Sequence, residues 1–217
     1  MRTRLLVAVP LLFGLGSVPT ASAAPTSAPS ATVRIVVAPV TSSGQPAAGF
    51  NHISKQSFTI DCSYKDPSIG AVSPNIEWCS PSAAYAVACW NASTAQRVLC
   101  MQDPSSHKLV QFKRQGRFAS TPIAKPRDQA PLLLILADGS RCQIRDGGAW
   151  GQPKGHPNLY GAYSCDKHGA AWLYAKGSYS DPHNGVDESS PAWRIRTGEN
   201  TVVWRYIAKA YFVATAS

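Results

Sequence analysis

The segment DGSRCQIRDGGAW contains the residues of this chain that are best suited to binding an anion. On an extended strand alternate residues share a face, so Arg141 and Arg145 fall together while Cys142 points the other way. Guanidinium groups beside a flexible glycine turn can hold a phosphate or a carboxylate, which makes Arg141, Arg145 and Trp150 candidate anion-binding residues. A structural interpretation stays open, in which a disulfide locks a tight hairpin and the arginines are solvated.

The tripeptide Asp61-Cys62-Ser63 suggests a second chemistry, nucleophilic catalysis by a cysteine. It resembles the motif that carries the nucleophile in NlpC/P60 cell-wall cysteine peptidases, where a later histidine, here His156 or His168, acts as base. Such a thiolate needs a helix start and an imidazole partner. Because Pro67 follows within a turn, no helix can begin directly after Cys62, and we interpret Cys62 as half of a disulfide. A secreted cell-wall hydrolase with a Cys/His pair remains the alternative.

Other catalytic motifs are absent from the sequence. It has no G-x-S-x-G turn, no H-E-x-x-H helix motif and no EF-hand spacing. Twelve acidic residues among 217 leave little material for a carboxylate-rich site. We therefore predict no catalytic residue, no metal and no cofactor, and the balance favours a protein that is not an enzyme.

The amino-terminal segment predicts export. Two arginines precede an apolar stretch from Leu5 to about Val18, which is too short to span a bilayer. An A-x-A cleavage pattern follows, so we expect a signal peptide over residues 1–23 that is cleaved near Ala23-Ala24. We expect no transmembrane segment in the mature chain.

The rest of the chain has the length of a single domain. A small, proline-bearing stretch predicts a disordered tail over residues 24–32, and one β-rich secreted domain is expected over residues 33–217.

The charge of the chain indicates anionic partners. Its net charge is +9, and removing the two leader arginines leaves 19 basic against 12 acidic residues, or +7. A protein of this charge is attracted to anionic envelope lipid, acidic polysaccharide or nucleic acid. The densest basic stretch, KLVQFKRQGRF, is interpreted as a solvated surface. No nucleic-acid-binding motif occurs, so lipid or polysaccharide is the favoured partner.

An even number of cysteines in an exported chain predicts three disulfides. The cysteines are Cys62, Cys79, Cys89, Cys100, Cys142 and Cys165. Cys142 and Cys165 lie in neighbouring strand patterns, far along the chain from the other four, so we expect them to pair. Closing their loop should stabilise the fold by about 3 kcal/mol.

The pattern CSPSAAYAVACW predicts a short helix over residues 80–90, with a serine as its cap and a proline at its first position. Such a helix would hold Cys79 and Cys89 about 15 Å apart, too far to bond. The returning strand RVLCM would bring Cys100 back to the helix start. We therefore expect Cys79–Cys100 and Cys62–Cys89, with Cys62–Cys79 and Cys89–Cys100 as the alternative.

Short apolar patterns separated by turns predict a strand-rich fold. The expected strands cover residues 33–40, 57–62, 97–101, 108–112, 131–137, 141–145, 159–165, 170–175, 192–198 and 200–216. Part of the last one, IAKAYFVA, has a composition that also suits a helix. The expected fold class is α+β and β-rich: a single disulfide-stapled domain of short antiparallel strands with one short helix near 80–90.

Several of these stretches together resemble a known type of protein. CSPSAAYAVACW, VLCMQDP, ILADGSRCQIRDGGAWG, YGAYSC, SPAWRIRTG and AYFVATA are similar to segments of small secreted disulfide-bonded proteins of actinobacteria, of the mycobacterial type. Their function is uncharacterised, so the resemblance implies a secreted, disulfide-bonded domain and no particular activity.

The six tryptophans suggest a second class of ligand. Aromatic rings on an extracellular β-domain can form a platform for a sugar, although most complete a small core. Trp150, after the glycine turn, is expected to be the most exposed. We predict a non-enzymatic extracellular or envelope-associated module for an anionic or carbohydrate ligand. A structural partner of another exported protein is a further alternative.

Overall fold

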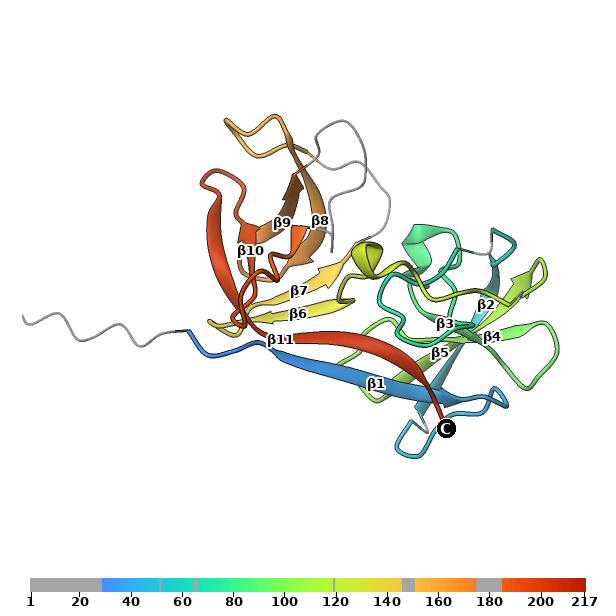
Figure 1. Ribbon diagram of the computed structural model, residues 1–217. Helices are drawn as coiled ribbons and strands as arrows, with labels where there is room; N and C mark the ends of the chain where they lie inside the picture. The colour runs from blue at the N-terminus through green and yellow to red at the C-terminus, as the bar shows by residue number, and fades with distance from the viewer. Residues whose placement is uncertain (1–28, 51, 65, 119, 146–150, 175–184) are drawn as a thin grey trace, which may run out of the picture.

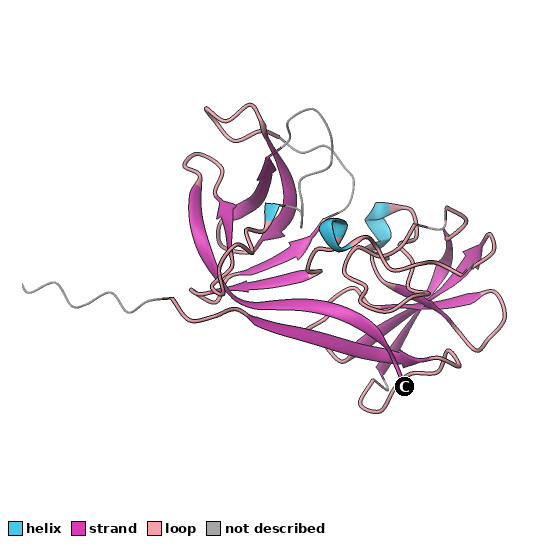
Figure 2. Ribbon diagram, in the orientation of Figure 1, coloured by secondary structure: helices cyan, strands magenta, loops and turns pink. Residues whose placement is uncertain are grey.

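The computed structural model describes residues 29–217 apart from 51, 65, 119, 146–150 and 175–184 (Figure 1). The described residues form eleven strands and short 3₁₀ turns, with no α-helix among them (Figure 2). The strands divide into a seven-stranded sheet and a four-stranded sheet. The chain is therefore β-rich, as its short apolar patterns predict, and the α+β class is wrong.

Six strands of the larger sheet close into an antiparallel barrel. They are β6 (Leu133–Leu136), β7 (Arg141–Ile144), β8 (Leu159–Cys165), β9 (Gly169–Tyr174), β10 (Arg194–Thr197) and β11 (Val203–Ala216). Each pairs with the next, and β11 also pairs with β6. The length of β11 allows this, because Val203–Tyr206 pairs with β10 and Ile207–Tyr211 pairs with β6.

β1 (Val33–Thr41) lies parallel to the second half of β11 and extends the sheet beyond the barrel (Figure 1). Thr32, just before it, joins the strands at this point. Its hydroxyl donates to the carbonyl of Ile207 at 2.7 Å and accepts from the amide of Trp193 at 2.8 Å. The last residue of the expected tail is therefore fixed to the barrel.

The four-stranded sheet has the order β2 (His52–Asp61), β5 (Lys108–Gln115), β4 (Arg97–Cys100), β3 (Cys89–Asn91). β2 and β5 are parallel, as are β1 and β11, so the expected antiparallel arrangement fails at these two pairs. Parallel neighbours need a long connection between them. The chain supplies one in the disulfide-rich segment and the two short strands between β2 and β5.

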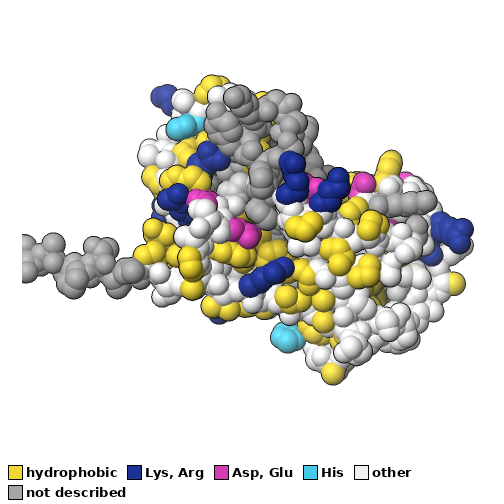
Figure 3. Space-filling view, viewed as in Figure 1, with side chains coloured by type: hydrophobic (Ala, Val, Ile, Leu, Met, Phe, Trp, Pro, Cys, Tyr) yellow, Lys and Arg dark blue, Asp and Glu magenta, His cyan; other side chains and the backbone are white. Residues whose placement is uncertain are grey.

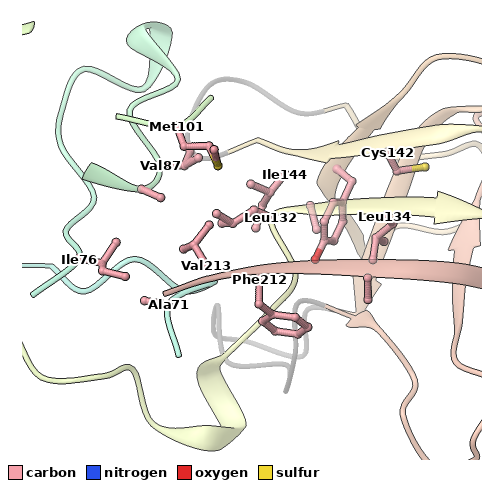
Figure 4. Packing of buried hydrophobic residues seen from close by; sticks show 14 of the residues in the cluster. Ala71, Ile76, Val87, Met101, Leu132, Leu134, Cys142, Ile144, Phe212 and Val213 are labelled. Atoms are coloured by element: carbon pink, nitrogen blue, oxygen red, sulfur yellow. The ribbon is translucent and has the colours of Figure 1, made fainter. Parts of the chain in front are cut away.

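One apolar core joins the two sheets (Figure 4). Ile76, Val87 and Met101 come from the half with the four-stranded sheet. They belong to the same buried cluster as Leu132, just before β6, and Val213 of β11. The largest buried cluster therefore contains residues from both halves of the structure, and it packs the two sheets together.

The helix predicted near residues 80–90 is absent. Only a 3₁₀ turn forms there, at Ser82–Ala84. Ser80 is extended and exchanges two backbone hydrogen bonds of 2.8 Å with Asp61 at the end of β2. This tertiary pairing satisfies the backbone where the helix would begin, and it overrides the helix propensity of the alanines.

The cysteine pairing predicted from that helix is wrong for the same reason. The disulfides are Cys62–Cys79, Cys89–Cys100 and Cys142–Cys165. With Ser80 paired to Asp61, Cys79 comes beside Cys62. Cys89 and Cys100 are opposite each other on β3 and β4, with their Cα atoms 4.0 Å apart. The third pair, across β7 and β8, is confirmed.

Most predicted strands and both predicted hairpins are confirmed, namely β6–β7 and β8–β9. The segment IAKAYFVA is a strand and not a helix. Its residues pair with β6 on one edge and with β1 on the other, so hydrogen bonds between strands replace those of a helix.

Three disulfides indicate an oxidising compartment, in agreement with export. Residues 1–28 lie outside the described part, so cleavage near Ala23-Ala24 stays a prediction. Within that part, no helix has the length and apolar character needed to span a bilayer.

Candidate functional site

The strand that carries the predicted anion site has the expected orientation. β7 turns Cys142 inward and leaves Arg141 half-exposed on the other face. Arg141, however, already holds a carboxylate of its own chain. Its Nη2 lies 3.0 Å from Oδ2 of Asp103, and its Nη1 donates to the hydroxyl of Ser105 at 2.9 Å. Because these partners precede β5, Arg141 ties the barrel to the smaller sheet.

A depression of about 290 Å³ lies beside Arg141, and Tyr85, Arg145 and Asp166 are among the residues that line it. Hydrogen bonds, first from the amide of Arg141, lower the pKa of Asp166. An ionised carboxylate therefore faces the same space as the arginines, and the depression carries mixed charge. Trp150 lies outside the described residues, so its part in the predicted site stays a prediction.

The residues of the alternative Cys/His site do not meet. Cys62 is fully buried and bonded to Cys79. His168 is on the barrel, where its Nε2 lies 2.5 Å from Oδ2 of Asp138, and His156 lines a separate groove. All six cysteines are in disulfides, so this form of the protein holds no thiolate nucleophile.

Asp138 is the centre of a polar cluster on the barrel. Besides His168 it contacts Arg205, whose Nη1 lies 3.5 Å from its Oδ2. The amide of Ser140 is the first cause that lowers the pKa of Asp138, and His168 adds to it. These contacts tie the β6–β7 turn to the β8–β9 turn and to β11. Among the described residues, no three His, Cys, Asp or Glu side chains lie together as a metal site.

The outer face of the barrel carries a site that the sequence did not reveal. Trp172 of β9, Arg196 of β10 and Trp204 of β11 stand opposite one another on neighbouring strands. Ile195 is fully buried in the core, so Arg196 and its partners face away from the barrel interior. Trp172 is buried, whereas Trp204 is 46% exposed.

Two guanidinium groups lie close to the ring of Trp204. Those of Arg194 and Arg196 lie 4.6 Å and 5.2 Å from its centroid, within the range of cation–π attraction. Arg194 also donates to Asp187 at 2.8 Å. Hydrogen bonds from Ser189, then from Arg194, lower the pKa of Asp187 to about 2. The carboxylate is therefore ionised at neutral pH and helps to fix Arg194 beside the indole.

A groove of about 330 Å³ adjoins this ring. The loop before β8 contributes His156 and Asn158 to it, and β10 and β11 contribute Arg196 and Trp204. The described residues that line the groove include no carboxylate. It therefore offers an aromatic surface, hydrogen-bonding groups and positive charge.

The sequence contains part of the pattern that forms this arginine and tryptophan site. In RIR and WRY, alternation puts Arg194 with Arg196 on one face of a strand, and Trp204 with Tyr206 on one face of another. It does not show that the two strands are neighbours, nor that the register sets Arg196 opposite Trp204. That register depends on the hairpin between β10 and β11.

Comparisons with family models, with curated proteins and with solved structures find no match to this chain. The resemblance to secreted actinobacterial proteins therefore stays a prediction, and any function is inferred from the geometry of the site.

Proposed function

We propose that this protein is a non-enzymatic binding module of the extracellular space or cell envelope, and that it holds an acidic carbohydrate against Trp204. One observation carries the proposal: a half-exposed indole lies within cation–π distance of two guanidinium groups at the rim of a groove. Large apolar surface exposed to water costs free energy, and a ligand that covers the ring recovers part of it.

The chemistry of the groove suits a sugar ring with an acidic substituent. The apolar face of a pyranose packs on an aromatic ring, and guanidinium groups bind carboxylate or sulfate through charge-assisted hydrogen bonds. Arg196 lines the groove, and His156 and Asn158 add hydrogen-bonding groups for hydroxyls. A neutral sugar would stack equally well but would form no charge-assisted hydrogen bond with a guanidinium group.

As the ligand site, the surface formed by Arg194, Arg196 and Trp204, here called the Trp204 face, is favoured over the depression at Arg141. The guanidinium of Arg141 is held by Asp103, and Asp166 adds negative charge to that depression. An anion there would compete with carboxylates of the chain itself. The proposal therefore places the ligand on β10 and β11 instead of β7.

Replacing Trp204 with alanine tests the proposal. Isothermal titration calorimetry with a galacturonic acid trimer should show binding to the wild-type protein, and weaker binding of a neutral glucose trimer. Trp204→Ala should weaken binding of the acidic trimer about tenfold, the loss expected when aromatic stacking is removed. Tyr85→Ala is the matched control, because Tyr85 is also 46% exposed but lies at the other depression.

Arg196→Gln separates charge from stacking. It should weaken binding of the acidic trimer and leave that of the neutral trimer unchanged, because only the acidic ligand uses the guanidinium. Equal affinity of wild-type and Trp204→Ala proteins for the acidic trimer, or no binding to wild type, would contradict the proposal.

A further inference from the structure

Basic residues gather at one end of the four-stranded sheet, where β2 and β5 finish and β4 begins. Lys113 lies opposite Arg97 on β4 and opposite Thr59 on β2. Arg114 follows Lys113 at the end of β5, and Arg117 comes directly after the Gly116 turn. Figure 3 shows Lys and Arg side chains at this end of the molecule.

Within the described part of the chain, none of Arg97, Lys113, Arg114 and Arg117 takes part in an ion pair. Within the same part of the chain, the guanidinium of Arg114 donates to the carbonyl of Gly116. Asp61 is the one acid on β2, β4 and β5.

The carboxylate of Asp61 already accepts hydrogen bonds from its own chain. Its carboxylate accepts the amide of Ser63 at 2.8 Å, and hydrogen bonds, first from the Ser63 side chain, lower its pKa. The positive charge at this end of the sheet is therefore only partly compensated.

Two exposed aromatic side chains lie at the same end of the sheet, with Phe58 on the face opposite to Lys113 and Arg97. Phe58, just before Thr59, is 45% exposed and rests edge-on against the buried Phe112, with ring centroids 5.1 Å apart. Tyr64 is 63% exposed. Its neighbour Ser63 packs so closely on the glycine turn of β5 that a Cβ at Gly116 would lie 2.6 Å from the Ser63 Cβ. We call Phe58, Tyr64, Arg97, Lys113, Arg114 and Arg117 the basic tip.

We infer that the basic tip docks on the surface of an anionic lipid bilayer. The cations complement acidic headgroups, and aromatic rings are favoured at the boundary between headgroups and acyl chains. Phe58 decides between a bilayer and a dissolved polyanion. Its ring has no polar atom, so it gains free energy by entering that apolar boundary, which a dissolved polyanion does not provide. The tip and the Trp204 face lie on different sheets, so the inference does not depend on the proposed function.

Vesicle co-sedimentation of the full chain tests the inference. The wild-type protein should co-sediment with vesicles of phosphatidylcholine mixed with phosphatidylglycerol. It should not co-sediment with vesicles of phosphatidylcholine alone. Lys113→Ser with Arg117→Ser should lower the partition coefficient about tenfold or more. Lys125→Ser with Lys209→Ser removes the same charge from exposed sites elsewhere and should lower it less than about twofold.

Phe58→Trp reports insertion directly. With brominated acyl chains in the anionic vesicles, this variant should show more fluorescence quenching than the wild-type protein, whose tryptophans form the background. Equal effects of the two double variants would overturn the inference, because net charge alone would then explain binding. It would also be overturned if Phe58→Trp showed no extra quenching, or if dextran sulfate bound in a tip-dependent way while anionic vesicles did not.

Discussion

Arg141 shows how the neighbours of a residue decide its role. Its chemistry suits an anion, and it does hold one, but the carboxylate belongs to Asp103. Their side chains are 41% and 37% exposed, so solvent screens the pair and its contribution to stability is about 0–1 kcal/mol. Its larger effect is geometric, because it fixes β7 to the turn before β5.

Asp187 makes a testable contribution to acid stability. Its pKa falls from the ordinary 3.8 to about 2 in the folded protein. Because the folded pKa is the lower one, the ionised form stabilises the fold above about pH 4, and this stabilisation is lost as pH falls towards 2. Asp187→Asn should therefore lower the urea midpoint at pH 6, and the difference from wild type should shrink by pH 2.

A constant difference between the two proteins from pH 6 to pH 2 would contradict this assignment. The pKa values of Asp138 and Asp166 are lowered as well, so the wild-type protein should lose stability in acid for several reasons. The contribution of Asp187 is only that part of the pH-dependent stability that is lost in the Asp187→Asn variant.

At the scale of elements, β11 organises the larger sheet. It pairs with β10 and β6 to close the barrel and with β1 beyond it. Its composition also suits a helix in part. A helix would leave the edges of β6 and β1 without partners, and the inter-strand hydrogen bonds decide the outcome. The same strand carries Trp204, so barrel closure also positions the proposed site.

Thr32 should contribute measurably to this arrangement. Thr32→Val keeps the shape of the side chain but removes one hydrogen bond to Ile207 and one from Trp193. We expect the free energy of unfolding to fall by about 1–2 kcal/mol, measured by urea denaturation. Thr32→Ser retains the hydroxyl and should lose less. If valine were as stable as threonine, the junction would not depend on these bonds.

On the scale of the whole molecule, the shared core couples the two sheets. Apolar residues of both halves form one buried cluster, and the contacts of Arg141 with Asp103 and Ser105 add polar links between them. The Trp204 face lies on the larger sheet and the basic tip on the smaller one. Both therefore belong to one packed structure.

Leu132→Ala tests this coupling. Leu132 is buried between the sheets, and its truncation should lower the free energy of unfolding by about 2–5 kcal/mol. Because the core is shared, tryptophan fluorescence and far-ultraviolet circular dichroism should report one common transition that shifts as a whole. Val36→Ala, at an exposed site on β1, should cost less than about 1 kcal/mol. Two separate transitions would show that the sheets unfold independently.

The sequence determined the properties that are set locally. Alternation in RCQIR placed Cys142 inward and the arginines outward, and turn residues such as Asp138-Gly139 marked the hairpins. The pairing of Cys142 with Cys165 followed from those neighbouring strands. The leader pattern predicted export, and an even number of cysteines in an exported chain was then enough to predict three disulfides.

Only the tertiary structure decided which distant segments meet. The pairing of Ser80 with Asp61 replaced the expected helix and changed two disulfides, and the register of β10 on β11 set Trp204 beside two arginines. The physical reason is that turn and strand preferences act over a few residues. Contacts between segments far apart in the chain depend on the free energy of the whole packed arrangement.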